Sequence, residues 1–356
     1  MRSATRRLTI FPAVLAVSFL MRSPLAQADT ADSDVRPKSG DTTVLGQQAK
    51  ALKPGEWVEL KTDGPGKLIS APEPSKKLDI MTWCDDGHWD NGTKQFVFMG
   101  LRQTRRFIAY SEKTNEWRDI GLPEDHEAAG SPPRTSQYGH VYSRNALDAE
   151  TSRFYHMDHN DGGGIYRYDL VKETWTKLPA GGDYKMTGVI EYFAARGGLV
   201  NLGSGKDGVR YFDTKKQAWE KLGPVDVHGH HSLGRHNPFR EEVLLAGGNE
   251  SPRIVVLLKK DGTMKRMKDA PFDLTVRHTI ITVDPVSGRY LFMDPTQKKL
   301  YEFDAEANTY HLVDDFTKTP WPFARYDAPV AAFIAEHGVT MWVARKTYLY
   351  KHTMGR

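Results

Sequence analysis

One phrase recurs along this sequence, and it is clearest in the run Ile165-Tyr-Arg-Tyr-Asp-Leu-Val-Lys-Glu-Thr-Trp-Thr-Lys-Leu-Pro179. It consists of an alternating aromatic segment that ends on Asp169, a polar turn, and a second segment that opens near Trp175. Alternation of apolar and polar residues is typical of a half-buried strand, so the phrase predicts two strands joined by a turn. Related phrases occur at residues 211–222 and 300–313. Repeats of this kind indicate stacked units rather than separate domains.

Six positions carry the tryptophan of the phrase or a residue that replaces it, and each is followed three positions later by an apolar residue. They are Trp57, Trp117, Trp175, Trp219, Met264 and Tyr310. These positions recur at intervals of about 44 to 60 residues, and each interval leaves room for two more strands upstream of the phrase. Four short strands per unit of roughly 45–50 residues are typical of a β-propeller blade.

The two ends of the predicted propeller complete one blade. The last unit has strands expected at 329–333, 340–344 and 347–351 and lacks an outer strand, whereas residues 56–60 form an outer strand with nothing before it. The sequence therefore predicts an all-β, six-bladed β-propeller with four antiparallel strands per blade. Its ring is closed by the N-terminal outer strand, which joins the three C-terminal strands. Closure of this kind removes exposed strand edges.

The repeated phrase also has a family resemblance. An aromatic residue and Asp, a polar turn, Trp and an apolar residue three positions later resemble the kelch repeat, and Gly247-Gly248 at the end of a predicted strand fits the same pattern. The resemblance covers residues 55–356 and implies a kelch-like β-propeller domain.

Residues 1–28 have the pattern of a secretory signal peptide. Arginines precede an apolar run at 8–21, and a small-residue cleavage site follows at Ala28. The run is too short for a good transmembrane span, which needs about 20 residues. We therefore expect an exported protein, periplasmic or extracellular, without a membrane span. The Sec route is the simpler expectation, and the pair Arg6-Arg7 also fits the twin-arginine route.

Residues 29–54 are polar, of mixed charge and without a sustained period, so we expect a flexible linker. The four arginines of the signal peptide account for the formal charge of +4, so the mature chain is close to neutral. It lacks the basic surface of a nucleic-acid-binding protein, and no nucleic-acid partner is expected. Cys84 is the only cysteine, so no intrachain disulfide can form.

The two faces of the predicted disc differ in composition. Turns between third and fourth strands, such as Val171-Lys-Glu, mix charges and contain no histidine, so we expect a solvated surface there. The loops between second and third strands and the beginnings of the innermost strands lie on the other face. Eight of the thirteen histidines fall on that face: His88, His140, His156, His159, His228, His230, His231 and His278. Binding residues concentrate on such loops, so this mouth of the axial funnel is the predicted site.

The residue types on this face fit an acidic sugar. Arginine binds a carboxylate bidentately, and a His or Tyr can then remove the adjacent proton as a general base. The predicted function is binding of an anionic carbohydrate, with β-elimination by a polysaccharide lyase or epimerisation as the reaction. The expected proton-transfer residues are His140, His231, His278, Tyr138 and Tyr326. The expected substrate-binding residues are Arg277, Arg325, Trp83, His156, His159 and Glu250, and Trp89 and Trp321 are further candidates for stacking on a sugar.

Two alternatives stay open. The first is a non-catalytic propeller that presents the same face to a glycan or a protein, because a fold does not fix a function. The second is a metal enzyme in which His228 and His230, on one side of an extended segment, bind a divalent metal. No other cofactor is expected, because the sequence has no Walker loop, no dinucleotide fingerprint and no Gly-x-Ser-x-Gly elbow.

Overall fold

The computed structural model of this protein describes residues 42–69, 80, 84, 86–101, 105–122, 141–158, 164–178, 188–203, 208–276, 278–323 and 329–352. The chain divides into two units, residues 1–36 and 37–356, and all described residues belong to the second. The expected signal peptide at 1–28 therefore lies outside the described residues. Within the described part of the chain, no helix has the length and apolar character needed to cross a membrane.

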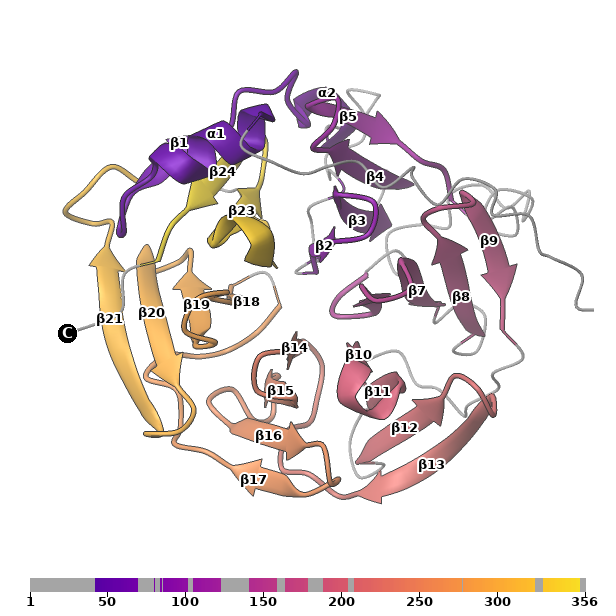
Figure 1. The fold of residues 1–356 in the computed structure, drawn as a ribbon. Coiled ribbons are helices and arrows are strands. Elements are labelled where there is room, and N and C mark those ends of the chain that lie inside the picture. The colour runs from indigo at the N-terminus through magenta and orange to yellow at the C-terminus, as the bar shows by residue number, and fades with distance from the viewer. Residues whose placement is uncertain are drawn as a thin grey trace, which may run out of the picture. The chain divides into compact units, whose positions relative to one another are not determined.

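The unit at 37–356 contains six antiparallel sheets of four strands each, arranged in a ring (Figure 1). This arrangement confirms the predicted six-bladed β-propeller. The first blade comprises β2 (His88–Asp90), β3 (Gln95–Leu101), β4 (Arg105–Ser111) and β5 (Glu116–Asp119). The second comprises β6 (Asn145–Asp148), β7 (Arg153–Asp158), β8 (Gly164–Asp169) and β9 (Thr174–Lys177). The third comprises β10 (Val189–Phe193), β11 (Gly198–Leu202), β12 (Val209–Asp213) and β13 (Ala218–Gly223). The fourth blade comprises β14 (Ser232–Asn237), β15 (Glu242–Gly247), β16 (Val255–Lys259) and β17 (Met264–Arg266). The fifth comprises β18 (Ile280–Val283), β19 (Tyr290–Asp294), β20 (Lys299–Asp304) and β21 (Thr309–Asp315).

The sixth blade combines strands from opposite ends of the domain. It consists of β22 (Val330–Ile334), β23 (Val339–Val343), β24 (Thr347–Tyr350) and, on the outside, β1 (Trp57–Glu59). In Figure 1, β1 in indigo lies beside β24 in yellow. Trp57 lies opposite Tyr350 in this pairing, and their rings stack with centroids 4.4 Å apart. The predicted closure of the ring by an N-terminal outer strand is confirmed.

The polar turn of the repeated phrase is held by its aspartate. In the second blade, Oδ1 of Asp169 accepts hydrogen bonds from the backbone N–H groups of Val171 and Lys172, at 3.1 and 2.9 Å. Glu173 then takes a positive φ of 54°, which reverses the chain into β9. Aspartates at the ends of β12 and β20 make the same pair of bonds. The Asp in the phrase therefore stabilises the turn in these three blades.

The tryptophan of the phrase packs on the aromatic residue that precedes this aspartate. Tyr168 and Trp175 lie opposite one another on β8 and β9, with ring centroids 5.0 Å apart. Equivalent pairs join β12 to β13 and β20 to β21, at 5.0 and 4.5 Å. Cross-strand aromatic pairs stabilise a sheet beyond the area they bury. They stabilise the outer hairpins of the second, third and fifth blades, whose inner strands face the axis.

The linker expected up to residue 54 ends earlier than predicted, because Val44–Ala51 forms helix α1. The Thr43 hydroxyl caps it by accepting a hydrogen bond from the N–H of Gly46 at 3.0 Å. Leu45 and Ala49, one helical turn apart, are buried in the core cluster that includes blades one and six.

Three shorter helical segments complete the described structure. Helix α2 (Gly66–Ile69) follows β1, and the 3-10 helices η1 (Ala194–Arg196) and η3 (Ala335–His337) form the turns after the innermost strands β10 and β22. The turn at η3 contacts α1.

Candidate functional site

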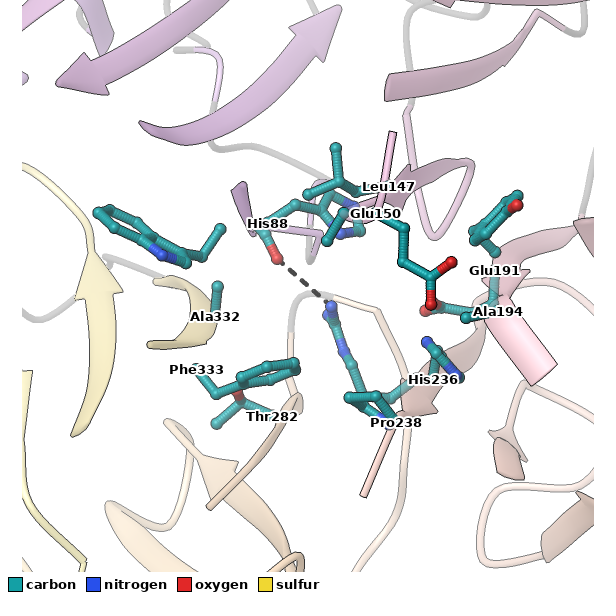
Figure 2. A pocket seen from close by; sticks show the side chains of 15 residues that line it. His88, Leu147, Glu150, Glu191, Ala194, His236, Pro238, Thr282, Ala332 and Phe333 are labelled. Atoms are coloured by element: carbon teal, nitrogen blue, oxygen red, sulfur yellow. Dashed lines mark hydrogen bonds between the residues drawn. The ribbon is translucent and has the colours of Figure 1, made fainter. Parts of the chain in front are cut away.

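A cavity of about 140 Å³ lies at the axis of the propeller, where residues near the innermost strands of all six blades meet (Figure 2). Its lining residues are Gly87, His88, Trp89, Leu147, Ala149, Glu150, Glu191, Tyr192, Ala194, Arg235, His236, Pro238, Thr282, Ala332 and Phe333. We call this cavity the axial pocket. A cavity of about 150 Å³ accommodates a molecule the size of benzene, so the enclosed part of this pocket matches one small ring.

The axial pocket lies at one mouth of the channel. Glu150, Ala194 and Pro238 follow the C-terminal ends of innermost strands, so the pocket is at the end where first strands turn into second strands. In an antiparallel blade this end also carries the turns between third and fourth strands. The ion pair between Arg240, after β14, and Glu306, after β20, spans 2.6 Å and confirms that the two kinds of turn share a face. The pocket therefore opens on the face for which the sequence predicted only solvated turns.

Arg235 is a lining residue of the axial pocket. It extends from β14 in the fourth blade towards the first blade, where its Nη1 donates to the carbonyl of Gly87 at 3.3 Å (dashed in Figure 2). Its Nη2 lies 3.5 Å from Oδ1 of Asp86, a carboxylate with no exposed surface. The guanidinium is therefore already neutralised by a carboxylate from across the axis.

Two neutral imidazoles line the walls. Burial, with the Arg235 charge as a second cause, holds the pKa of His88 well below its usual range. The same two causes lower the pKa of His236 to about 4. The Nε2 atoms of both rings and the hydroxyl of Thr282 are enclosed and have no hydrogen-bond partner among the described residues. Such atoms are costly to bury, and a ligand with hydroxyl groups provides the missing partners.

Aromatic surfaces face these polar groups. Trp89 lies on β2, and its indole N–H donates to Oε1 of Glu336 at 3.0 Å, which fixes the ring against the pocket. Phe333 lies on β22 and packs edge-on against Phe239 at 5.2 Å. Tyr192 lies on β10 and stacks on a tyrosine of the second blade at 5.8 Å. Trp89 was a predicted stacking residue, and it lines the pocket.

Two carboxylates complete the pocket. Glu191 on β10 is 3% exposed, whereas Glu150, in the turn after β6, is exposed at the mouth. The sequence analysis missed both residues, together with Arg235 and His236. One signal was available, since Glu191 and Arg235 are charged residues inside innermost strands that are otherwise largely buried. A buried charge in a central strand requires a partner or a function.

The opposite mouth brings several predicted histidines together. His231 and His230 have ring centroids 6.1 Å apart, and His278 from the fifth blade is close enough to influence His231 electrostatically. Burial lowers the pKa of His231, the two neighbouring imidazoles add to this, and a hydrogen bond with Asn249 opposes it. The His231 Nδ1 lies 2.9 Å from Oδ1 of Asn249. We call His230, His231 and His278 the histidine cluster.

Other predicted residues on that side have separate partners. His228 lies 3.6 Å from the carboxylate of the exposed Glu250. His278 Nδ1 lies 3.2 Å from the hydroxyl of Thr296. His156, expected on a loop as a substrate-binding residue, instead lies within β7, is completely buried and pairs with Asn145 at 2.9 Å. It supports the inner strand of its blade and does not reach a mouth.

Several predicted residues fall outside the described residues. They are Trp83, Tyr138, His140, His159, Arg277, Arg325 and Tyr326. The expected arginine clamp for a carboxylate is therefore not part of the geometry described above. Trp321 packs against Phe316 and Phe323 and is not among the residues that line the axial pocket.

Neither the family models nor the curated proteins searched gave a match to this chain. Among solved structures, a protein of unknown function from Bacteroides thetaiotaomicron is similar, with a TM-score of 0.53 and 12% identity over 73% of this chain and 67% of that chain. A fungal alcohol oxidase of the AA5 family in complex with copper has a TM-score of 0.48 and 11% identity, over 84% and 76% of the two chains. TolB from Acinetobacter baumannii has a TM-score of 0.45 and 10% identity, over 63% and 52%. At these identities the likeness concerns the fold alone, and the chain is a six-bladed β-propeller protein.

Proposed function

We propose that this protein binds a small polyhydroxylated ligand, the size of one sugar ring, in the axial pocket. The observation that carries the proposal is the meeting of aromatic surfaces with enclosed, unpaired polar atoms in one small cavity. The apolar face of a sugar ring packs on an aromatic side chain such as Trp89, while its hydroxyls pair with atoms such as His236 Nε2. Concave sites with a few placed polar groups are typical of ligand binding.

The charges of the pocket favour a neutral or amino sugar over an acidic one. Arg235 is already paired with Asp86, and the carboxylates of Glu150 and Glu191 line the wall. An anionic ligand would meet the buried carboxylate of Glu191 in a region of low dielectric constant and the exposed carboxylate of Glu150 at the mouth, and both weaken binding. The ligand class proposed for this mouth therefore differs from the uronate predicted for the other mouth.

Calorimetric titration of the purified protein with neutral sugars, amino sugars and uronates tests this proposal. We expect a neutral or amino sugar to bind, and Trp89→Leu to weaken binding at least tenfold. Trp321→Leu is the matched control, because Trp321 is a partly buried tryptophan that does not line the pocket. Absence of binding across the panel, or equal effects of the two substitutions, would overturn the proposal.

The histidine cluster supports a second candidate function at the opposite mouth, the predicted binding of an anionic carbohydrate with lyase or epimerase activity. Its specific support is the lowered pKa of His231, which leaves that imidazole unprotonated at neutral pH, as a general base must be. The test is new ultraviolet absorbance from unsaturated uronate on a panel of anionic polysaccharides. Loss of that absorbance in the His231→Gln and His278→Gln variants would support a catalytic role for these histidines. Inactivity of the unmutated protein would contradict the lyase activity.

The other sequence-based expectations accompany these proposals. The kelch-like character of the repeat and export to the periplasm or the outside of the cell stay predictions. The non-catalytic alternative, in which the protein presents a glycan or protein ligand, is compatible with the axial pocket and requires no reaction there. Sugar binding without turnover supports this alternative over the enzymatic one.

A further inference from the structure

A second group of chemically active side chains lies where helix α1, the first blade and the sixth blade meet. Glu112 lies in the turn after β4, and Glu336 and His337 belong to η3, the turn after β22. One ligand atom from each of these three residues lies within 4.8 Å of the others. Among the residues that the structure describes, this is the one group of His, Cys, Asp or Glu side chains with that geometry.

The group is organised around a buried carboxylate. Glu112 is 2% exposed, although it lies in a surface turn. Its Oε1 accepts a hydrogen bond from the Thr43 hydroxyl at 2.7 Å and lies 2.8 Å from Nε2 of His337. Its Oε2 is enclosed and has no hydrogen-bond partner in the described part of the chain. A buried carboxylate oxygen without a partner is costly, and a bound cation removes that cost.

We propose that Glu112, Glu336 and His337 form a binding site for a divalent cation, with zinc as the best match. An imidazole nitrogen and two carboxylate oxygens are a donor set that suits zinc, and three protein ligands leave a fourth position for water. Thr43 supports the site from outside, because its hydroxyl orients the Glu112 carboxylate. The site would join α1 to the first and last blades, the junction at which the ring closes.

Substitution of Lys94 provides a specific test of the proposed zinc site. Its ammonium lies 2.9 Å from Oε1 of Glu336, so it competes with a metal ion for the same carboxylate. Substitutions at Lys94 and at the ligands must therefore change zinc affinity in opposite directions. A general folding effect does not predict this pair of results, and the change at His337, which removes no negative charge, separates ligation from a general electrostatic effect.

The experiment uses the full chain after treatment with a chelator, titrated with zinc chloride by calorimetry and by thermal unfolding. Zinc at a hundredfold excess over its Kd should raise the Tm by about 5 °C. Glu112→Gln and His337→Asn should each weaken zinc binding at least tenfold, and Lys94→Met should strengthen it. The control is His311→Gln, which removes an exposed histidine that belongs to neither predicted site and should leave the affinity unchanged.

Each result decides the question. Unchanged zinc affinity in His337→Asn and Lys94→Met overturns the proposal, even if Glu112→Gln fails to fold. Loss of zinc binding in His228→Gln, with His337→Asn unaffected, would overturn the proposal and assign the ion to the opposite face, where His228 and His230 were the predicted metal ligands. Glu336 also accepts the indole N–H of Trp89, so zinc-induced quenching of tryptophan fluorescence that is lost in Trp89→Phe would connect this site to the axial pocket.

Discussion

The guanidinium of Arg235 and the carboxylate of Asp86 lie 3.5 Å apart, although they come from opposite sides of the propeller ring. Arg235 belongs to the fourth blade, and Asp86 precedes the innermost strand of the first. Both residues are buried, at 5% and 0% exposure. This charge pair connects two blades that are not neighbours in the ring.

We predict that Arg235→Met lowers the free energy of unfolding by about 3–5 kcal/mol, because it removes one member of a buried ion pair and leaves the Asp86 charge in place. Adding Asp86→Asn should restore part of this loss, since the remaining charge is then removed as well. Urea unfolding of the single and double variants at neutral pH measures both effects.

The control for this prediction is an exposed pair. Lys260 lies 2.9 Å from Glu241, with both side chains 55% exposed. Lys260→Met should change the free energy of unfolding by less than about 1 kcal/mol. If Arg235→Met has an effect as small as that of Lys260→Met, the pair across the axis does not stabilise the ring.

A second prediction concerns pH. The pKa of His236 is lowered from 6.5 to about 4, so the unfolded chain binds a proton between these values that the folded chain does not. Stability should therefore be complete above pH 6.5 and fall as the pH decreases towards 4, with a contribution from His236 of about 3 kcal/mol. His236→Gln should flatten this part of the pH profile measured by urea unfolding. The exposed His311 provides the control, and equal slopes for His311→Gln and His236→Gln would contradict the prediction.

A third prediction concerns the contact between innermost strands. A Cβ atom added at Gly234 would lie 2.2 Å from Cγ1 of Val189 and 3.1 Å from Cγ of Glu191. Gly234→Ala should therefore cost about 1–3 kcal/mol through overpacking, and it should weaken sugar binding by displacing Glu191. Gly66→Ala is the control, because the nearest atom to its added Cβ is at 3.6 Å. Thermal unfolding and calorimetric titration of both variants give the comparison.

A fourth prediction tests the closure of the ring. The ring of Trp57 contacts four other aromatic rings, at 4.4 to 6.1 Å between centroids. Trp57→Ala should lower the free energy of unfolding by roughly 3 kcal/mol, whereas Trp57→Phe should retain most of it because an aromatic ring remains. A loss of less than about 0.5 kcal/mol in Trp57→Ala would show that β1 is not needed to hold the blade together.

The fold could be predicted because its signals are local. The turn bonds of Asp169 and the contact between Tyr168 and Trp175 lie within one short phrase, and the phrase is repeated. Helix α1 was missed although Leu45 and Ala49 have helical spacing, because a helix of eight residues depends on tertiary packing for its stability. Propensity and periodicity alone do not report such packing.

The axial pocket could not be predicted because it depends on where six separate strands place their side chains. The positions of the histidines in the sequence predicted a binding site at one mouth of the channel, and the structure does bring His230, His231 and His278 together there. The pocket lies at the other mouth, and one of its lining residues, Arg235, reaches across the axis to Asp86. No spacing pattern in the sequence indicates this contact between Arg235 of the fourth blade and Asp86 beside the first.

The pairing of β1 with β24 has a consequence for biosynthesis. During translation β1 is among the first strands made and β24 among the last, so the sixth sheet cannot form until nearly the whole domain has been synthesised. Until then the nascent chain has an incomplete ring with an unpaired edge at each end, the condition in which strands add to other chains. The two edges are therefore covered in one late step, in which the three residues of β1, Trp57–Glu59, dock on β24.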